Sequence, residues 1–314
     1  MRIDPIRLVR WATGAKLPNA MPISDTTPDP GIMGPGSVTW RLHHEQWLIF
    51  GGARAFLMQA AHPKVAQGAI DHSAYAEDPF GRVFRTVNAM TVLLVGTTHE
   101  VNATAKHINR LHATVQGTLK HNTGRHKIGD HYSAIEVQPL LWVHVAFVDS
   151  MLSAYRAFVG PLSPADCEDY WQESLRYARR LGLTDAVLPP TYAAMEAYIR
   201  ESIASGEVAV GAEATEVART VLFPPLPWYR RPLWALVRLT TSGQLPPEIR
   251  QGYKLPWRWY HRPGFKLICG LFRLLRRLFP GLVSYSTLVA FAEQRARGEL
   301  AAPAPASTPG PVGG

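Results

Sequence analysis

Three polar side chains with chemical potential share one side of an apolar helical pattern in the segment FGRVFRTVNAM, residues 80–90. Arg82, Arg85 and Thr86 stand at positions i, i+3 and i+4, so they lie on one face of a helix. The same face continues with apolar residues, which bound the polar patch. Buried guanidinium groups are costly unless they meet an anion or a hydrogen-bonding partner. We therefore predict a buried cluster with an acidic group opposite it.

A single histidine interrupts another apolar stripe, in the segment RLHATVQG. The helical neighbours of His112 are Ile108, Val115 and Leu119. A histidine in this setting is most often a satisfied core residue, and a ligand role is the alternative. One imidazole ligand together with arginines that pair with carboxylates is what non-covalent haem requires, because haem has two propionates and an open iron face. His112 and the arginine cluster are therefore candidates for a haem b (iron) site.

Three more histidines are candidates for binding or proton transfer. His144 lies on the very apolar segment LWVHVAFVDS, His62 lies at a helix end in QAAHPKV, and His72 follows Asp71 in IDHSAY. The sequence has no G-x-S-x-G elbow, H-E-x-x-H motif, glycine-rich phosphate loop or C-x-x-C-H motif. The common hydrolase, zinc-protease, nucleotide and covalent-haem signatures are therefore absent.

The elements that position these residues are predicted to be helices, and the fold class all-α. Apolar residues recur with a period of 3.6 over 97–120, and residues 138–160 are apolar almost all round, as expected of a central helix. Residues 162–183, in which Ser163 and Pro164 stand near the start, and 191–206 are predicted to be further helices, while strand-like alternation is scarce. Ser37 is expected to cap a helix that Pro63 ends. We expect an irregular arm over 1–36, a single helical domain over 37–298 and a disordered tail over 299–314, which is rich in proline and glycine.

The positive charge is concentrated near the C-terminus. The chain has a formal net charge of +9, and residues 228–279 contain nine Arg and two Lys against one acid, Glu248. A basic region can bind nucleic acid, but no nucleic-acid-binding motif accompanies it, so no such partner is expected. The two cysteines are far apart, no secretory signal is visible, and no run of about 18 apolar residues occurs. These features favour a cytoplasmic protein without a spanning helix.

Within this region, residues 264–279 read as a basic amphipathic helix. Lys266, Arg273, Arg276 and Arg277 share one arc, opposite a broad leucine-rich face. This pattern is typical of a helix that lies on an anionic membrane surface. A packed helix with a solvated face has the same pattern, so both interpretations remain open.

Five segments in order resemble a family of bacterial and fungal oxygenases: GPGSVTWRL, GGARAFLMQAAHPKVAQG, DPFGRVFRT, RLHATVQG and LLWVHVAFVDS. This family includes the latex clearing protein, a rubber oxygenase, and the oxygenase of mycophenolic acid biosynthesis. The resemblance covers roughly residues 33–205. It implies an all-helical, globin-like core that holds a b-type haem through one proximal histidine.

The resemblance also implies roles for individual residues. His112 matches the proximal ligand, and Arg82, Arg85 and Thr86 match the distal segment, where the rubber enzyme has Arg, Lys and Thr. His144 falls near a further family histidine. Arg85 thus replaces the distal lysine, and a guanidinium is a poor iron ligand because it stays protonated.

A second departure concerns the general base. No residue matches the glutamate base of the rubber enzyme, and Glu77, Asp78 and His72 are the nearby candidates. Both departures argue against carrying rubber over to this chain as its substrate.

The resulting hypothesis is a haem-dependent oxygenase that adds dioxygen to a C=C bond of an apolar, isoprenoid or lipid-like substrate. His112 would hold the iron, Arg82 would pair with a propionate, and Arg85 and Thr86 would donate hydrogen bonds to dioxygen. Three alternatives stay open. The protein could be a haem-free enzyme using His62, His72, His112 or His144, or a haem- or lipid-binding protein without turnover. In the third, the arginines are core residues paired with Asp149 or Glu100.

Overall fold

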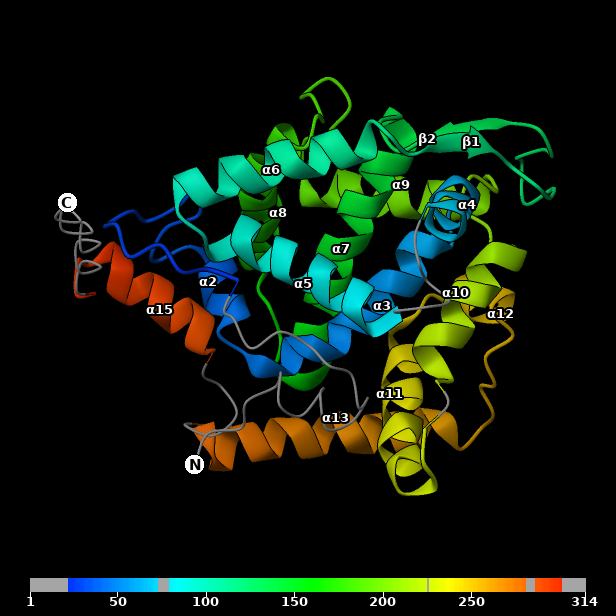
Figure 1. The fold of residues 1–314 in the computed structure, drawn as a ribbon. Helices are drawn as coiled ribbons and strands as arrows, with labels where there is room; N and C mark the ends of the chain where they lie inside the picture. Colours follow the sequence, from blue (N-terminus) through cyan, green and yellow to red (C-terminus); the bar gives the residue numbers. More distant parts are fainter. Residues whose placement is uncertain (1–21, 73–78, 225, 281–285, 301–314) are drawn as a thin grey trace, which may run out of the picture.

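The computed structural model of the chain describes residues 22–72, 79–224, 226–280 and 286–300. The predicted all-α class is confirmed, with one two-stranded sheet beside the helices (Figure 1). The first elements are α2 (Val38–His43), η1 (Gln46–Leu48), α3 (Ile49–Ala60), α4 (Pro63–Asp71), α5 (Pro79–Val95) and α6 (Thr98–His112). After the sheet come α7 (Val137–Phe158), α8 (Pro164–Arg180), α9 (Tyr192–Ala204), α10 (Ala212–Leu222), η2 (Trp228–Arg230), α11 (Arg231–Gln244), α12 (Pro247–Gly252), α13 (His261–Leu278) and α15 (Thr287–Ala296).

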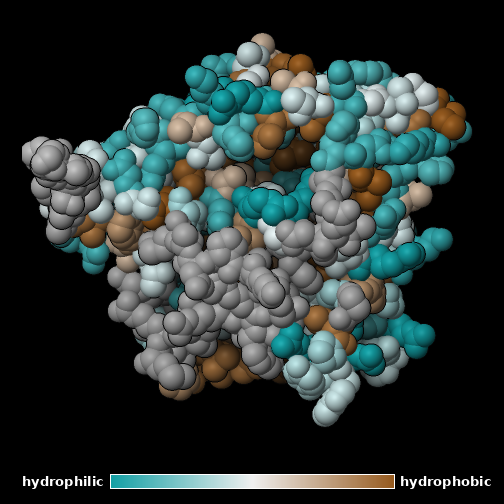
Figure 2. Space-filling model, in the orientation of Figure 1, coloured by the Kyte–Doolittle hydropathy of each residue, from teal (hydrophilic) through white to brown (hydrophobic). Residues whose placement is uncertain are grey.

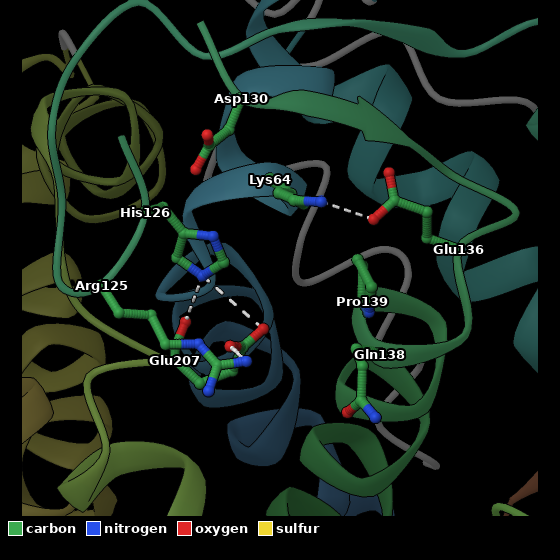
Figure 3. A pocket seen from close by; sticks show the side chains of 8 residues that line it. All are labelled: Lys64, Arg125, His126, Asp130, Glu136, Gln138, Pro139 and Glu207. Atoms are coloured by element: carbon green, nitrogen blue, oxygen red, sulfur yellow. Dashed lines mark hydrogen bonds and ion pairs between the residues drawn. The ribbon is translucent and has the colours of Figure 1, made fainter. Parts of the chain in front are cut away.

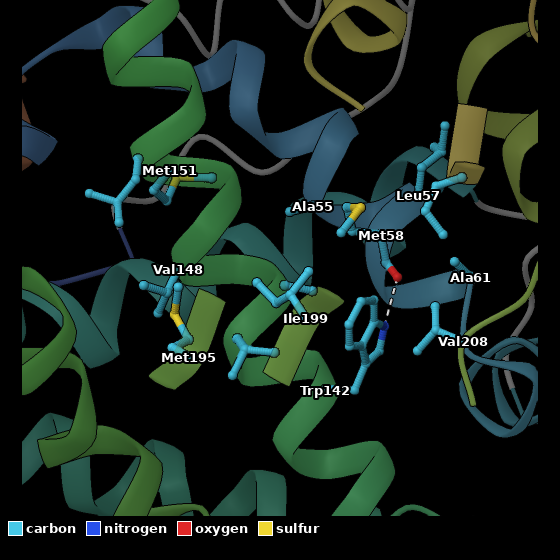
Figure 4. Close-up of a cluster of buried hydrophobic side chains, with 14 of the residues drawn as sticks. Ala55, Leu57, Met58, Ala61, Trp142, Val148, Met151, Met195, Ile199 and Val208 are labelled. Carbon is cyan, nitrogen blue, oxygen red and sulfur yellow. Dashed lines mark hydrogen bonds between the residues drawn. The ribbon is translucent and has the colours of Figure 1, made fainter. Parts of the chain in front are cut away.

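The centre of the fold is the packing of α3 against α7. A Cβ added to Gly51 would lie only 2.9 Å from both the Met151 methyl carbon and the Ser150 carbonyl oxygen, so the two helices approach closely at this glycine. The buried Trp142 indole N–H donates to the Met58 carbonyl oxygen at 2.7 Å, which satisfies its one polar atom within the apolar cluster (Figure 4). Around this pair lies the main hydrophobic core, to which α8, α9 and α10 contribute.

Helix α7 is the one described helix long and apolar enough to cross a membrane. Of its most apolar window, 67% is buried inside the fold. A soluble protein's central core helix has the same length and composition.

The predicted cap at Ser37 is present, but the helix that it starts is shorter than expected. The Ser37 hydroxyl accepts from the Trp40 N–H at 3.1 Å, and α2 then ends at His43. Glu45 takes an extended conformation, with φ −81° and ψ 112°, between α2 and η1. Its carboxylate accepts two hydrogen bonds from Arg276 on the distant helix α13, at 2.9 and 2.5 Å. This long-range ion pair lies at the break between α2 and η1, which the local sequence did not predict.

Helices α5 and α6 form an antiparallel pair joined by the short Gly96–Thr97 turn. Thr97 and Glu100 form a reciprocal capping box that fixes the start of α6. In Figure 1 the two helices meet at this turn and diverge toward their other ends.

A β-hairpin follows α6, and its first strand lies within the range 97–120, where the apolar pattern predicted a helix. Strand β1 (Gln116–Thr118) pairs antiparallel with β2 (His131–Ser133), and the long loop between them folds back onto the rest of the protein. Gly124 has φ +58°, and a Cβ there would lie 2.1 Å from the Gly206 carbonyl oxygen. Only glycine allows this approach, which brings the loop against the α9–α10 connection.

The C-terminal helix α13 packs on the fold through one face and leaves another in solvent. Cys269 and Phe272 are buried with Ala154 and Phe158 of α7. Four leucines on a different side of α13 are exposed: Leu267, Leu271, Leu274 and Leu278. The helix is thus packed on the fold and also presents an exposed apolar stripe, and its docking on a membrane stays a prediction.

The structure describes only part of the expected N-terminal arm and C-terminal tail. Residues 22–36 contain no helix or strand, yet Ile23 and Met33 are buried beside Trp40 in a second hydrophobic cluster. Residues 1–21 of the expected arm and 301–314 of the expected tail lie outside the described residues.

Candidate functional site

The arginine cluster lies at the open end of the α5–α6 pair. Arg82 is half-buried and donates to the Ala69 carbonyl oxygen at 3.1 Å, whereas Arg85 and Thr86 are exposed. The predicted burial of Arg85 and Thr86 is therefore wrong. Burial changes along this face of α5. Leu93, near the turn to α6, is fully buried, whereas Arg85 and Thr86 lie where α5 has separated from α6.

His112 is the last residue of α6, and its ring is half-buried. It lies almost as far from the Gly96–Thr97 turn as Arg82 does on the opposite helix, so the two residues stand at about the same level of the antiparallel pair. Burial lowers the pKa of His112, which leaves the imidazole neutral near pH 7. Within the described residues its ring forms no hydrogen bond, so a nitrogen lone pair is available.

The surface is hollowed between α5 and α6, and Figure 2 shows that the floor of this hollow is apolar. A neutral imidazole with an unengaged nitrogen, nearby guanidinium groups and an apolar floor are the features that a haem needs. The residue types at this end of the helix pair therefore match those that a haem site needs.

The acids considered as partners for the arginines are engaged elsewhere. Asp149 lies 2.5 Å from Arg54, which also donates to Ser150 and to the Gln244 carbonyl oxygen. Glu100 accepts from the Thr97 N–H and lies 3.7 Å from the buried Arg295. A structural ion pair of the cluster with either acid is thus not the arrangement seen.

The other predicted histidines are placed apart from one another. His144 is buried between α7 and α8, where its Nε2 lies 3.2 Å from the Ser174 hydroxyl and its ring packs on Trp171 and Tyr177. Burial lowers the pKa of His144 to about 3. Its Nδ1 and the Tyr177 hydroxyl are buried and have no hydrogen-bond partner among the described residues. These contacts indicate a core position for His144.

The candidates for a general base near residue 75 give little support to that role. The exposed His72 is bonded through Nε2 to the Gln116 carbonyl oxygen of β1 at 2.8 Å. Glu77 and Asp78 lie outside the described residues.

The structure brings together one predicted histidine, His62, and two residues that the sequence analysis missed, His126 and Glu207. The ligand atoms of these three buried side chains all lie within 4.8 Å of one another. His62 Nδ1 accepts from the Lys64 N–H at 3.2 Å, so Nε2 carries the proton of the neutral ring and donates to Glu207 Oε1 at 3.2 Å. His126 Nε2 donates to the Glu207 carbonyl oxygen at 3.0 Å and lies 3.6 Å from Oε1.

Burial and mutual contact set the charges in this cluster. Burial lowers the pKa of His62, and the hydrogen bond from His62 lowers the pKa of Glu207. The ring is thus neutral and the carboxylate ionised near pH 7. The second carboxylate oxygen of Glu207 forms an ion pair with Arg125.

His126 and Glu207 also line a cavity of about 330 Å³ (Figure 3). Lys64 and Glu136, 2.5 Å apart, lie on its opposite side, and Asp130 lies above. The ionic side chains of this cavity are two cations, Lys64 and Arg125, and three carboxylates, Asp130, Glu136 and Glu207.

No local signal could have revealed this cluster. His62 caps α4, His126 lies in the hairpin loop, and Glu207 follows α9, so the three come from distant segments. Only the close approach of Gly124 to Gly206 brings the last two together, and that contact depends on tertiary packing.

Comparison with known proteins identifies relatives of most of the helical region. Residues 40–277 match the family described as ER-bound oxygenase mpaB/B′/rubber oxygenase, catalytic domain. The chain is 25% identical over 230 residues to the uncharacterised protein Rv2237 of Mycobacterium tuberculosis and, equally, to the uncharacterised protein Mb2261 of Mycobacterium bovis. Each match covers 71% of this chain and 87% of the relative.

No solved structure matches the chain significantly. The family match spans most of the chain and includes α5, α6 and the cluster around Glu207. The chain therefore belongs to the mpaB/B′/rubber oxygenase catalytic-domain family.

Proposed function

We propose that the protein is a haem b-dependent oxygenase whose cofactor sits in the hollow between α5 and α6. The observation that carries this proposal is the placement of His112 and Arg82 at the same level of two diverging helices, in a chain of an oxygenase family. His112 would ligate the iron through its neutral imidazole, and Arg82 would pair with a propionate. When bound, the haem supplies the oxygen chemistry, and the protein supplies ligation, donors and an apolar surface.

Arg85 and Thr86 have a natural role in this arrangement. Both are exposed at the open end of the helix pair, so they can donate hydrogen bonds to dioxygen entering the hollow. A guanidinium is a poor iron ligand, so Arg85 is assigned no bond to the iron. The substrate would be an apolar alkene, isoprenoid or lipid-like, that rests on the apolar floor while dioxygen adds across its double bond.

We further propose that the protein docks on an anionic membrane surface through α13. The exposed leucines of this helix are flanked by the exposed cations Lys266, Arg273 and Arg277, and Figure 2 shows apolar side chains along the lower edge where α13 runs. Arg276, predicted to belong to this cationic face, is instead paired with Glu45. Exposed aromatic residues lie in the same region of the chain, at Trp228, Tyr229, Trp259 and Tyr260. The protein would thus be cytoplasmic and peripheral to the membrane.

The haem proposal is tested by the visible spectrum of the purified protein after haem titration. A Soret band is expected in the wild type and in His107→Ala, a control histidine exposed on the same helix, and is lost in His112→Ala. Absence of the band in the wild type, or its persistence in His112→Ala, would overturn the ligand assignment.

Turnover needs a separate measurement, because a haem carrier would give the same spectrum. Oxygen uptake with isoprenoid alkenes is expected in the wild type. Replacing Arg82, or replacing Arg85 and Thr86 together, should lower the rate by up to about 100-fold, the lower end of what a preorganised donor contributes. A haem-loaded protein that consumes no oxygen with any alkene would indicate binding without catalysis.

A further inference from the structure

The cluster of His62, His126 and Glu207 has the composition of a metal site, and it shares no residue with the α5–α6 hollow. We propose that these three side chains bind one divalent transition-metal ion. Two imidazoles and one carboxylate are a ligand set for iron(II), zinc and related ions, and they leave further coordination positions open.

The distances already suit coordination. Ligands at about 2.1 Å from an ion lie roughly 3.0–3.5 Å apart when they occupy neighbouring positions of an octahedron or tetrahedron. Glu207 Oε1 lies 3.2 Å from His62 Nε2 and 3.6 Å from His126 Nε2. Two of the three ligand pairs are therefore close to coordination distance, and the whole set, which lies within 4.8 Å, has to draw together to enclose an ion.

The surroundings of the cluster favour a bound cation that keeps one side open to the cavity. The cavity at the cluster carries one more carboxylate than cationic side chain, and His126 and Glu207 line its wall. The open coordination positions would face this cavity, whose volume of about 330 Å³ admits water or a small ligand. Arg125 contacts the other carboxylate oxygen, Oε2, so it would orient Glu207 as an outer partner while Oε1 binds the ion.

Metal binding also has a cost that the structure identifies. The ion would take the place of the proton now on each Nε2, and that single ring proton would move to Nδ1. His62 would then lose the hydrogen bond that its Nδ1 accepts from the Lys64 N–H, which is long at 3.2 Å. His126 loses its bond to the Glu207 carbonyl oxygen at 3.0 Å. His62 also loses the charge-assisted hydrogen bond from its Nε2 to Glu207 Oε1. Direct coordination by three ligands has to exceed the loss of these two neutral hydrogen bonds and of this charge-assisted one.

The test is titration of the haem-free, chelator-treated full chain with Co²⁺, followed by visible absorption and calorimetry. One equivalent is expected to bind, and Glu207→Gln and His126→Ala should each weaken binding by more than about 100-fold, the upper end of the effect of losing an outer partner. His121→Ala is the matched control, because His121 is an exposed histidine of the same loop whose partner is Glu213 of α10. It should bind like the wild type.

Two outcomes would overturn the proposal that the cluster binds a metal ion. Failure of Co²⁺ and Zn²⁺ to bind the wild type, or equal binding by Glu207→Gln, would show that the cluster is a hydrogen-bonded support only. Glu207→Gln keeps an acceptor for His62, and circular dichroism will show that it folds. His112→Ala should bind Co²⁺ normally, so failure of the haem proposal and failure of this one are distinguishable.

Discussion

Removing the leucine stripe of α13 should release the protein from anionic vesicles. The change is Leu267→Ser with Leu271→Ser and Leu274→Ser. All three side chains are exposed, Leu267 by 72%, so serine should leave the fold intact. The buried contacts of α13, through Cys269 and Phe272, stay in place.

The expected loss of vesicle binding follows from the exposed fractions of the leucine side chains. The four leucines of the stripe are exposed by 46–72%, which together amounts to about two whole side chains. Burying that surface in lipid is worth roughly 3–6 kcal/mol, at about 1.5–3 kcal/mol for each leucine. Each cation near the anionic surface adds about 1 kcal/mol. Losing three of the four leucines should therefore cost at least ~2 kcal/mol, or roughly a 30-fold loss of partitioning.

Flotation with vesicles of phosphatidylserine and phosphatidylcholine measures this loss. Ile128→Ser with Ile135→Ser is the control, because both isoleucines are exposed and lie in the hairpin region away from α13. Lys266→Glu with Arg277→Glu should also weaken binding, and this loss should shrink as salt is raised. Wild-type flotation by the triple leucine variant, or an equal loss in the isoleucine control, would refute the reasoning.

Three further outcomes are expected from the core. Arg54→Met should lower the free energy of unfolding by about 3–5 kcal/mol in urea melts, because it leaves the carboxylate of Asp149 without its partner. Gly51→Ala should cost about 1–3 kcal/mol, read as a lower midpoint, because its methyl group would press on Met151. Burial lowers the pKa of His144 to about 3 in the folded protein, whereas the ordinary histidine pKa of 6.5 applies to the unfolded chain. Between pH 3 and pH 6.5 the unfolded chain therefore binds a proton at His144 that the folded protein does not. Stability should fall as pH falls below 6.5, by up to about 1.4 kcal/mol per unit, and His144→Leu should lose this part of the slope.

Much of the helical architecture follows from local sequence. Ser37, Thr97 and Ser163 cap helices because their hydroxyls accept from free backbone N–H groups, and this chemistry is readable from residue type. The break at Glu45 is different, because its partner Arg276 lies on α13. The short strands of the hairpin were missed because three residues are too few for an alternating pattern.

The candidate site residues also differ in how far local sequence could predict their positions. Helical spacing correctly placed Arg82, Arg85 and Thr86 on one face, but it could not show that α5 leaves its neighbour at this end and exposes two of them. For His126 and Glu207, the decisive feature is a glycine that lets one loop approach another. Neither fact is encoded in the residues that would do the chemistry.

The two anchoring contacts of α13 determine how the molecule would stand at a surface. Arg276 is held by Glu45, and Arg273 donates to the Arg156 carbonyl oxygen at the end of α7. The helix axis is thus fixed to the central helix, so attached molecules would share one tilt. In the view of Figure 1, the α5–α6 hollow lies on the far side of α5 from α13. Its mouth would open to water, so a substrate would arrive through the aqueous phase, favouring molecules that can leave the bilayer over a polymer embedded in it.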